Sequence, residues 1–241
     1  TLFLFKENVM RKTIAALLTL ALAVALASTV QAQRGRDGQL NLLYWQAPST
    51  MNPNLSGGTK ELEASSVVLE PLARYDHNGN LVPYLAVGIP TVANGGVAED
   101  LTSITWKLKQ GIKWSDGSAL TAADVVFTYE YCTDADTGCT QSNYYNDIKS
   151  VTAVDAHTVR IDFTVAKPFP YSAFVGYNGP ILQKAQFKGC EGQKAQACTK
   201  QNFYPIGTGP FKVKDFKPND VIVFEANENY RDSNKPAFHT L

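Results

Sequence analysis

Residues 105–128 read TWKLKQGIKWSDGSALTAADVVFT and contain, in immediate succession, the signals of a strand, a turn and a helix. Apolar and polar side chains alternate over residues 104–109, which is typical of a strand with one buried and one solvent-exposed face. Residues 114–117 (WSDG) carry a turn signal. Thr121, followed three positions later by Asp124, is a variant of the capping box, so a helix is predicted to begin there.

The rest of the chain carries shorter signals of both kinds. They predict a first strand at 40–45, a helix at 61–72, a hairpin at 74–81 with Asn78-Gly79 as its turn, and strands at 159–163 and 221–224. Strands and helices alternate without a regular period. This indicates an α+β fold, or a mixed sheet, and not a repeated βαβ arrangement.

The composition is that of a globular protein. Of 241 residues, 44% are hydrophobic and 18% are charged, and 22 basic residues balance 22 acidic ones, so the formal net charge is zero. No strongly basic surface for nucleic acid is therefore expected. The three histidines, His77, His157 and His239, are dispersed along the chain. Neither a metal site nor a cofactor is predicted.

Residues 10–32 have the pattern of a secretory signal peptide. A basic pair precedes the apolar run 14–26, and the small residues at 30–32 form a cleavage motif. A retained membrane anchor is the alternative, but the run is short for a membrane span. Residues 1–9 then lie upstream of the start. Because Gln33, and not a cysteine, follows the cleavage motif, we expect a soluble periplasmic protein and not a lipoprotein.

The four cysteines fall into two local pairs, each within a polar loop that contains glycine. Four cysteines allow three disulfide pairings. In an oxidising compartment we favour Cys132 with Cys139 and Cys190 with Cys198. Zinc binding is the less favoured alternative, because the spacings are wide and no histidine is near.

Five stretches, taken in order, resemble the peptide/nickel family (family 5) of periplasmic solute-binding proteins. They are EPLARY at 70–75, the stretch 105–128, DAHTV at 155–159, GTGPF at 207–211 and EANENY at 225–230. The resemblance extends over almost all of residues 39–235, and the order of the five stretches makes it specific.

The resemblance implies a periplasmic-binding-protein-like fold of type II, cluster C, with an inserted extra domain. Residues 33–54 and 165–241 are then expected to form a split first lobe, which is incomplete, and residues 55–164 the inserted domain. Members of the family are about twice as long as this sequence. The distal lobe is therefore expected to be missing, with this chain as an N-terminal portion.

The resemblance also implies a function. It is that of a monomeric solute-binding component of an ABC importer, which captures a peptide and delivers it to the permease subunits. A nickel-, haem- or oligosaccharide-binding member of the family is the first alternative, and a secreted hydrolase is the second. The sequence contains neither GxSxG nor HExxH, so no catalytic residues are assigned and the protein is not predicted to be an enzyme.

Candidate ligand-binding residues follow from the chemistry of peptides and from the resemblance. Glycines in the loop 56–61 allow a ligand backbone to approach closely, although a plain turn leading into a helix explains them equally well. Aromatic side chains form walls for ligand side chains, although aromatics are more often core residues. The candidates are Trp45, Gly57, Gly58, Thr59, Tyr145, Tyr177, Asn178, Thr208 and Gly209. For the glycines at 207 and 209 backbone geometry is the alternative explanation.

Overall fold

The computed structural model describes residues 38–232, 236 and 238–241. The predicted upstream segment 1–9 and signal peptide 10–32 lie outside these residues. The α-helices are α2 (Thr59–Ser65), α3 (Ala122–Thr133), α4 (Lys184–Phe187) and α5 (Thr199–Phe203). The strands are β1 (Ala73–Tyr75), β2 (Leu81–Pro83), β3 (Ser103–Lys107), β4 (Ile148–Asp155), β5 (Thr158–Phe163), β6 (Phe211–Lys217) and β7 (Val221–Ala226). Short 3₁₀ helices are η1 (Pro53–Leu55), η2 (Ala135–Thr137), η3 (Ser142–Tyr145) and η4 (Gly192–Ala197).

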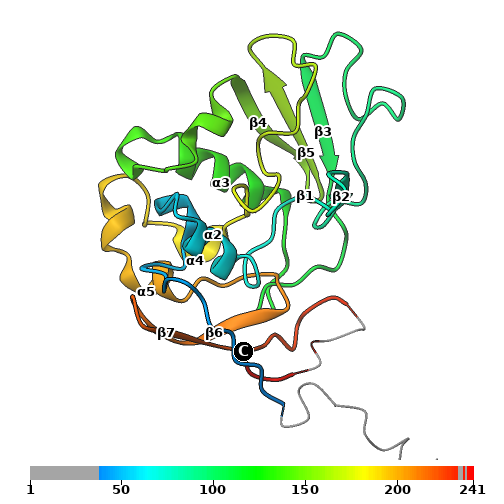
Figure 1. Ribbon diagram of the computed structural model, residues 1–241. Coiled ribbons are helices and arrows are strands. Elements are labelled where there is room, and N and C mark those ends of the chain that lie inside the picture. Colours follow the sequence, from blue (N-terminus) through cyan, green and yellow to red (C-terminus); the bar gives the residue numbers. More distant parts are fainter. Residues whose placement is uncertain (1–37, 233–235, 237) are drawn as a thin grey trace, which may run out of the picture. The chain divides into compact units, whose positions relative to one another are not determined.

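A three-stranded antiparallel sheet in the order β3-β5-β4 packs against α3 (Figure 1). The predicted strands at 104–109 and 159–163 correspond to β3 and β5, and both predictions are confirmed. Trp106 pairs with Val159 and Ile104 with Ile161, and all four side chains are buried. The combination of this sheet with separate helices confirms the α+β class.

Helix α3 begins where the capping box predicts. The backbone N–H of Thr121 donates to the Asp124 carboxylate over 2.9 Å. The second oxygen of Asp124 accepts from the backbone N–H of Lys184, also over 2.9 Å, which ties α3 to the start of α4. On the next turn the Thr128 hydroxyl accepts from the backbone N–H of Leu182. Helix α3 is thus covered by the sheet on one side and by residues 182–187 on another.

The predicted hairpin at 74–81 is present as β1 and β2, which pair antiparallel. Its turn uses Gly79 at φ +81°, a conformation that glycine adopts without steric cost. The Asp76 carboxylate accepts from the backbone N–H groups of Asn78 and Asn80 and closes the turn. Local turn chemistry therefore determines this element.

A second hairpin, β6 and β7, lies at the opposite end of the described structure from the three-stranded sheet, with the short helices between them (Figure 1). The prediction of a strand at 221–224 is confirmed by β7. Residues 239–241 lie along β7, where Phe224 and Leu241 exchange two backbone hydrogen bonds. Gln39 forms an isolated parallel bridge to Thr240.

Two predicted elements differ from the structure. The first strand at 40–45 is wrong: these residues are irregular, and Leu42 and Leu43 are exposed. Their neighbour Gln39 makes a single bridge, so the segment has no ladder to hold it extended. The helix predicted at 61–72 is present only as α2, which ends at Ser65.

Both favoured disulfides are present. Cys132 at the end of α3 is bonded to Cys139, and Cys190 is bonded to Cys198. The two loops that they close touch each other, because the backbone N–H of Gly192 donates to the Thr137 hydroxyl over 2.7 Å. The disulfides therefore brace a common region beside α3.

Candidate ligand-binding site

The loop at residues 56–59 leads into α2 and has an exposed backbone. Gly57 and Thr59 are exposed, and Gly58 donates its N–H to the Ser56 hydroxyl over 3.3 Å. A Cβ on Gly57 would meet only the Cβ of Thr140, at 4.0 Å. The space in front of Gly57 is thus open, as a surface that receives a ligand main chain requires.

A second exposed element is the turn that carries Tyr177 and Asn178. Gly176 adopts φ +72° and donates its N–H to the carbonyl of Ala73. Gly179 leaves no room for a side chain, because a Cβ there would lie 2.4 Å from the backbone nitrogen of Val175. These glycines fix a tight turn whose tip projects Tyr177, which is 52% exposed.

The turn begins at a backbone conformation that side chains rarely adopt. Phe174 has φ +61° although it is a buried aromatic residue. Its ring packs against that of Tyr145 at 5.3 Å, which holds the residue in place. Such local strain of about 1–3 kcal/mol persists where the surrounding structure imposes it, and it concentrates at functional sites.

The two elements are joined through residues 140–144. Thr140 lies beside Gly57, and the Tyr144 hydroxyl accepts from the side-chain amide of Asn178 over 3.0 Å. We call the surface formed by Gly57, Thr140, Tyr144, Tyr177 and Asn178 the platform. It offers amide and hydroxyl groups, aromatic rings and open backbone, without a charged side chain among its five members.

Three of the predicted site residues are buried away from the platform surface. Tyr145 is 3% exposed, and burial raises the pKa of its phenol. Thr208 is 1% exposed and donates its hydroxyl to the Glu70 carboxylate over 2.9 Å. Gly209 donates its N–H to the carbonyl of Val68. These residues take part in packing in this structure, and none presents a side chain to a ligand.

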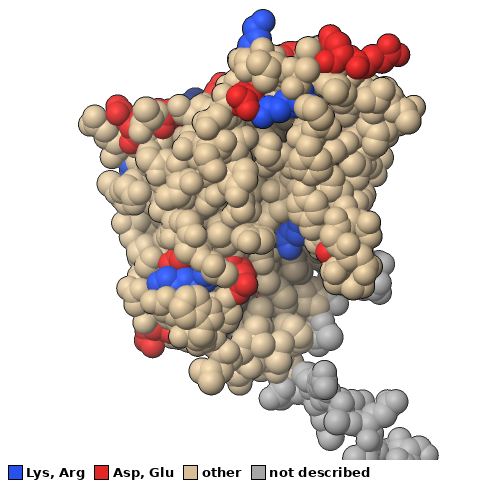
Figure 2. Space-filling model, turned by 45° about the horizontal axis from the view of Figure 1, so that its top comes forward, with Lys and Arg blue, Asp and Glu red and all other residues tan. Residues whose placement is uncertain are grey.

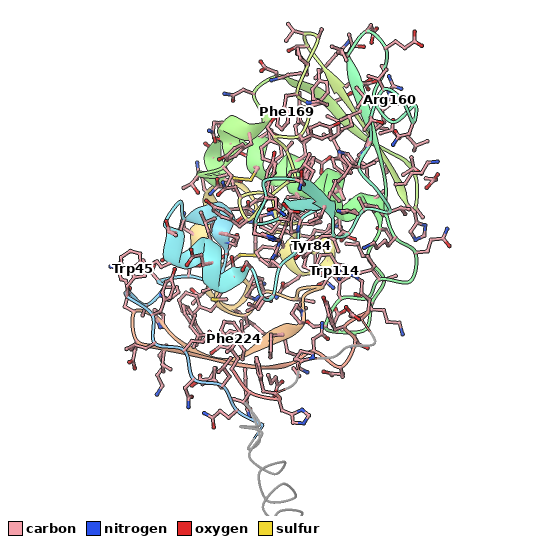
Figure 3. The ribbon with its side chains drawn as sticks, turned by 45° about the vertical axis from the view of Figure 1, so that its right-hand side comes forward. Trp45, Tyr84, Trp114, Arg160, Phe169 and Phe224 are labelled. Atoms are coloured by element: carbon pink, nitrogen blue, oxygen red, sulfur yellow. A yellow bond between two sulfur atoms is a disulfide. The ribbon has the colours of Figure 1, made fainter. Side chains whose placement is uncertain are left out.

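Trp45 lies at the edge of the molecule (Figure 3). Its indole is 70% exposed, and its ring centre is 6.0 Å from that of Tyr44 (Figure 3). Of the predicted residues, Gly57 and Asn178 are linked indirectly, through Thr140 and Tyr144, and Tyr177 adjoins Asn178 in the same turn. Sequence reasoning did not find Thr140, although its position directly after Cys139 was a usable signal.

The buried carboxylate of Glu61 lies next to Gly58, within the loop at 56–59. Glu61 accepts hydrogen bonds from the backbone N–H and the hydroxyl of Ser49, at 2.8 and 2.9 Å. Burial raises the pKa of Glu61, but the two Ser49 hydrogen bonds and the charge of Lys60 outweigh it, so its pKa lies below the usual value. A Cβ on Gly58 would lie 2.3 Å from the second Glu61 oxygen, so a side chain at position 58 would require the Glu61 carboxylate to shift.

Two hollows of the surface lie elsewhere. A groove of about 630 Å³ runs between residues 39–48, α2 and β7, and a second hollow of about 630 Å³ lies near Lys107 and His157. The platform is part of neither. Figure 2 shows one face of the molecule, on which charged side chains are few and scattered.

The described residues contain no group of three or more His, Cys, Asp and Glu side chains that is arranged to hold a metal ion. None of their helices has the length and hydropathy needed to cross a membrane.

Comparison with known proteins shows a consistent likeness. Residues 80–241 match the family described as "Bacterial extracellular solute-binding proteins, family 5 Middle". The oligopeptide-binding protein AppA of Bacillus subtilis is 30% identical over 188 residues, which cover 76% of this chain and 32% of that protein. The nickel-binding periplasmic protein of Escherichia coli is 28% identical over 196 residues, covering 79% of this chain and 34% of that protein.

The solved structures agree with this likeness. The structure of AppA from Bacillus subtilis in complex with a nonapeptide superposes with a TM-score of 0.69 and 25% identity. It covers 80% of this chain and 37% of the AppA chain. This chain therefore spans about a third of the length of the relatives that it matches.

Proposed function

Because this chain belongs to the family 5 bacterial extracellular solute-binding proteins, we propose that it is part of a protein that captures a peptide and delivers it to an ABC importer. The names of its relatives support a peptide, since AppA is an oligopeptide-binding protein that was solved with a nonapeptide. In this proposal the protein works as a soluble monomer in the periplasm, without a cofactor, after removal of residues 10–32. It binds its ligand and does not transform it.

The platform is the observation that carries this proposal. A peptide presents amide N–H and carbonyl groups along its main chain and mostly apolar side chains beside it. Exposed backbone at Gly57 suits the main chain, and the Asn178 amide supplies a further polar group. The ring of Tyr177 suits an apolar side chain. An uncharged surface of this kind holds many peptide sequences without selecting one.

The proposal includes a division of the chain into lobes. Residues 55–164 form the inserted domain, and residues 33–54 and 165–241 form the split first lobe. Two separate sheets support it, since β3-β5-β4 lies within the first range and β6-β7 within the second. The platform then lies where these parts meet, and the remaining part of the protein closes over the ligand.

The test is a binding measurement on the full-length gene product. Thermal-shift screening against a mixed peptide library, followed by calorimetry, identifies a ligand. Tyr177→Ala is then expected to raise the dissociation constant about tenfold, since loss of a stacked ring costs about 1–1.5 kcal/mol. Phe169→Ala is the matched control, because Phe169 is an exposed aromatic that packs against Tyr171 outside the platform (Figure 3).

Two outcomes would reject the proposal. One is the absence of peptide binding at millimolar concentration, together with tight binding of Ni²⁺ in a parallel titration. The other is an equal effect of Tyr177→Ala and Phe169→Ala on peptide affinity, because the platform would then have no special part in binding.

A further inference from the structure

The segment that precedes the platform loop, residues 51–54, is completely buried although two of its four residues are asparagines. Buried amides usually have hydrogen-bond partners. The Asn52 side chain finds them on two sides, whereas the side-chain amide of Asn54 has no partner among the described residues. We propose that the two disulfide-closed loops hold this segment between them, and that Asn52, Asn202 and Gln141 are positioning residues for the platform. This inference rests on the proposed function, because it treats the platform as the ligand-binding surface.

The first loop, closed by Cys132 and Cys139, holds the end of the segment. Thr140, which follows Cys139, donates its backbone N–H to the carbonyl of Asn54 over 2.9 Å, and its hydroxyl donates to the same carbonyl over 3.3 Å. Gln141 is buried and donates its side-chain amide to the carbonyl of Pro53 over 3.3 Å. Since Thr140 also lies beside Gly57, this loop fixes two parts of the platform relative to each other.

The second loop, closed by Cys190 and Cys198, holds the start of the segment. Asn202 lies in α5 just after Cys198, and its side-chain amide donates to the carbonyl of Ala195 inside the loop over 2.8 Å. The carbonyl of Asn202 accepts from the backbone N–H of Met51 over 2.9 Å. Its side-chain oxygen accepts from the amide of Asn52, also over 2.9 Å.

Asn52 links both sides. Its amide donates to Asn202 and, over 3.2 Å, to the hydroxyl of Tyr131, the residue before Cys132 on α3. Its side-chain oxygen accepts from the backbone N–H of Asn54 and so starts η1. One buried side chain thus connects α3, α5 and the segment, and an interior network of this kind has few alternative arrangements.

The consequence for binding is preorganisation. If either loop opens, residues 51–54 lose anchors at one end, and the backbone at Gly57 no longer has one position. A ligand must then order the loop as it binds, and affinity falls by that cost. A role limited to global stability predicts no such change at a temperature at which the protein is fully folded.

The experiment compares three variants of the full-length protein: the pair Cys132→Ser and Cys139→Ser, the pair Cys190→Ser and Cys198→Ser, and Asn202→Ala. The last leaves both disulfides intact and so keeps the test possible if a cysteine pair fails to fold. Val159→Ala in β5 is the control, because it weakens a buried strand far from the segment in sequence. All measurements are made well below the melting temperature of each variant.

The first measurement is amide hydrogen exchange without ligand, resolved to single residues. We expect at least about tenfold faster exchange at the amides of Met51 and Thr140 in one or more of the three variants. The amide of Phe163, bonded to the carbonyl of Thr102, should be unchanged. Unchanged exchange at both Met51 and Thr140 in all folded variants would overturn the inference, whatever the protein binds.

The second measurement is peptide affinity, which should fall about fivefold or more in the same variants and not in Val159→Ala. Faster exchange with unchanged peptide affinity would overturn the positioning role. Faster exchange in a protein whose wild type binds no peptide would instead reject the proposed function, and would leave the support of residues 51–54 by the two loops established.

Discussion

Arg231 and Glu70 form a two-pronged ion pair across 161 residues of sequence. The two guanidinium nitrogens of Arg231 lie 2.5 and 3.0 Å from the two carboxylate oxygens of Glu70. Glu70 is 2% exposed and also accepts from the Thr208 hydroxyl. The contact ties the segment that follows β7 to a residue three positions before β1. The ion pair therefore holds these two distant segments together.

Replacement of Arg231 by methionine is expected to lower the free energy of unfolding by about 3–5 kcal/mol, because it leaves the Glu70 carboxylate buried and without its cation. Urea denaturation measures this loss. The double variant Glu70→Gln with Arg231→Met should regain most of it, since no buried charge remains. A double variant less stable than Arg231→Met alone would contradict this account.

The carboxylate of Asp124 should make the pH dependence of stability run in an unusual direction. Burial raises the pKa of Asp124 above its ordinary value of 3.8, and the hydrogen bonds from Thr121 and Lys184 offset only part of the shift. The folded state then holds this proton more tightly than the unfolded chain does. The contribution of Asp124 to stability therefore falls as the pH rises from 3.8 to the higher folded pKa.

Asp124→Asn checks this by removing the titrating group. Asparagine has one acceptor oxygen in place of two, so one buried N–H loses its partner and the variant should be about 1–3 kcal/mol less stable at low pH. Urea melts between pH 3.5 and 7 should show a smaller difference between wild type and variant at the higher pH. A difference that grows with pH would show that hydrogen bonding, and not burial, dominates.

Replacement by alanine should affect stability differently at two glycines, Gly207 and Gly57. A Cβ on Gly207 would lie 1.9 Å from the carbonyl oxygen of Val68, a backbone atom that cannot turn away. Gly207→Ala should therefore destabilise by about 1–3 kcal/mol or more. Gly57→Ala should change stability by less than about 0.5 kcal/mol, because its Cβ meets only Thr140 at 4.0 Å. Thermal denaturation of both variants distinguishes the cases, and equal melting temperatures would count against the packing at Gly207.

Gly57→Leu separates binding from folding. The leucine side chain would occupy the open space that the ligand backbone needs, so the dissociation constant for peptide should rise about tenfold or more while the melting temperature stays close to that of the wild type. Gly88→Leu is the control, since a Cβ on Gly88 would meet nothing within 4 Å. Undiminished affinity in Gly57→Leu would remove this loop from the site.

Local chemistry made part of the fold predictable from sequence. The turn at Gly79 and the capping box of Thr121 with Asp124 depend on residues within a few positions of each other, and both are present as expected. The helix at 61–72 was overestimated because tertiary contacts end it. The carbonyl of Val68 accepts from Gly209, whereas a longer helix would have paired it with the N–H of Leu72. The carbonyl of Val67 accepts from Phe211, and a longer helix would have left it unpaired because Pro71 has no N–H.

Strand β4, which was not predicted, has a weak pattern for a physical reason. In β4 the side chains after Val151 are exposed on both faces of the sheet. The sequence therefore has no regular alternation of apolar and polar residues from which a strand could be predicted. The candidate site was predictable where glycines and exposed aromatics mark it, at Gly57 and Tyr177. It was not predictable at Tyr145, because sequence alone does not distinguish an aromatic residue of a binding wall from one that packs under it.

The three tryptophans differ in exposure, so their fluorescence can report on two separate regions of the protein. Trp106 and Trp114 are buried, whereas Trp45 stands in water beside the groove of residues 39–48 (Figure 3). Iodide should quench the fluorescence of Trp45 and should not quench that of Trp106 or Trp114. One fluorescence experiment then reports two events separately. A red shift in the emission of Trp106 and Trp114 reports unfolding of the core, and a decrease in the fraction of emission quenched by iodide reports that a ligand or partner covers the surface around Trp45.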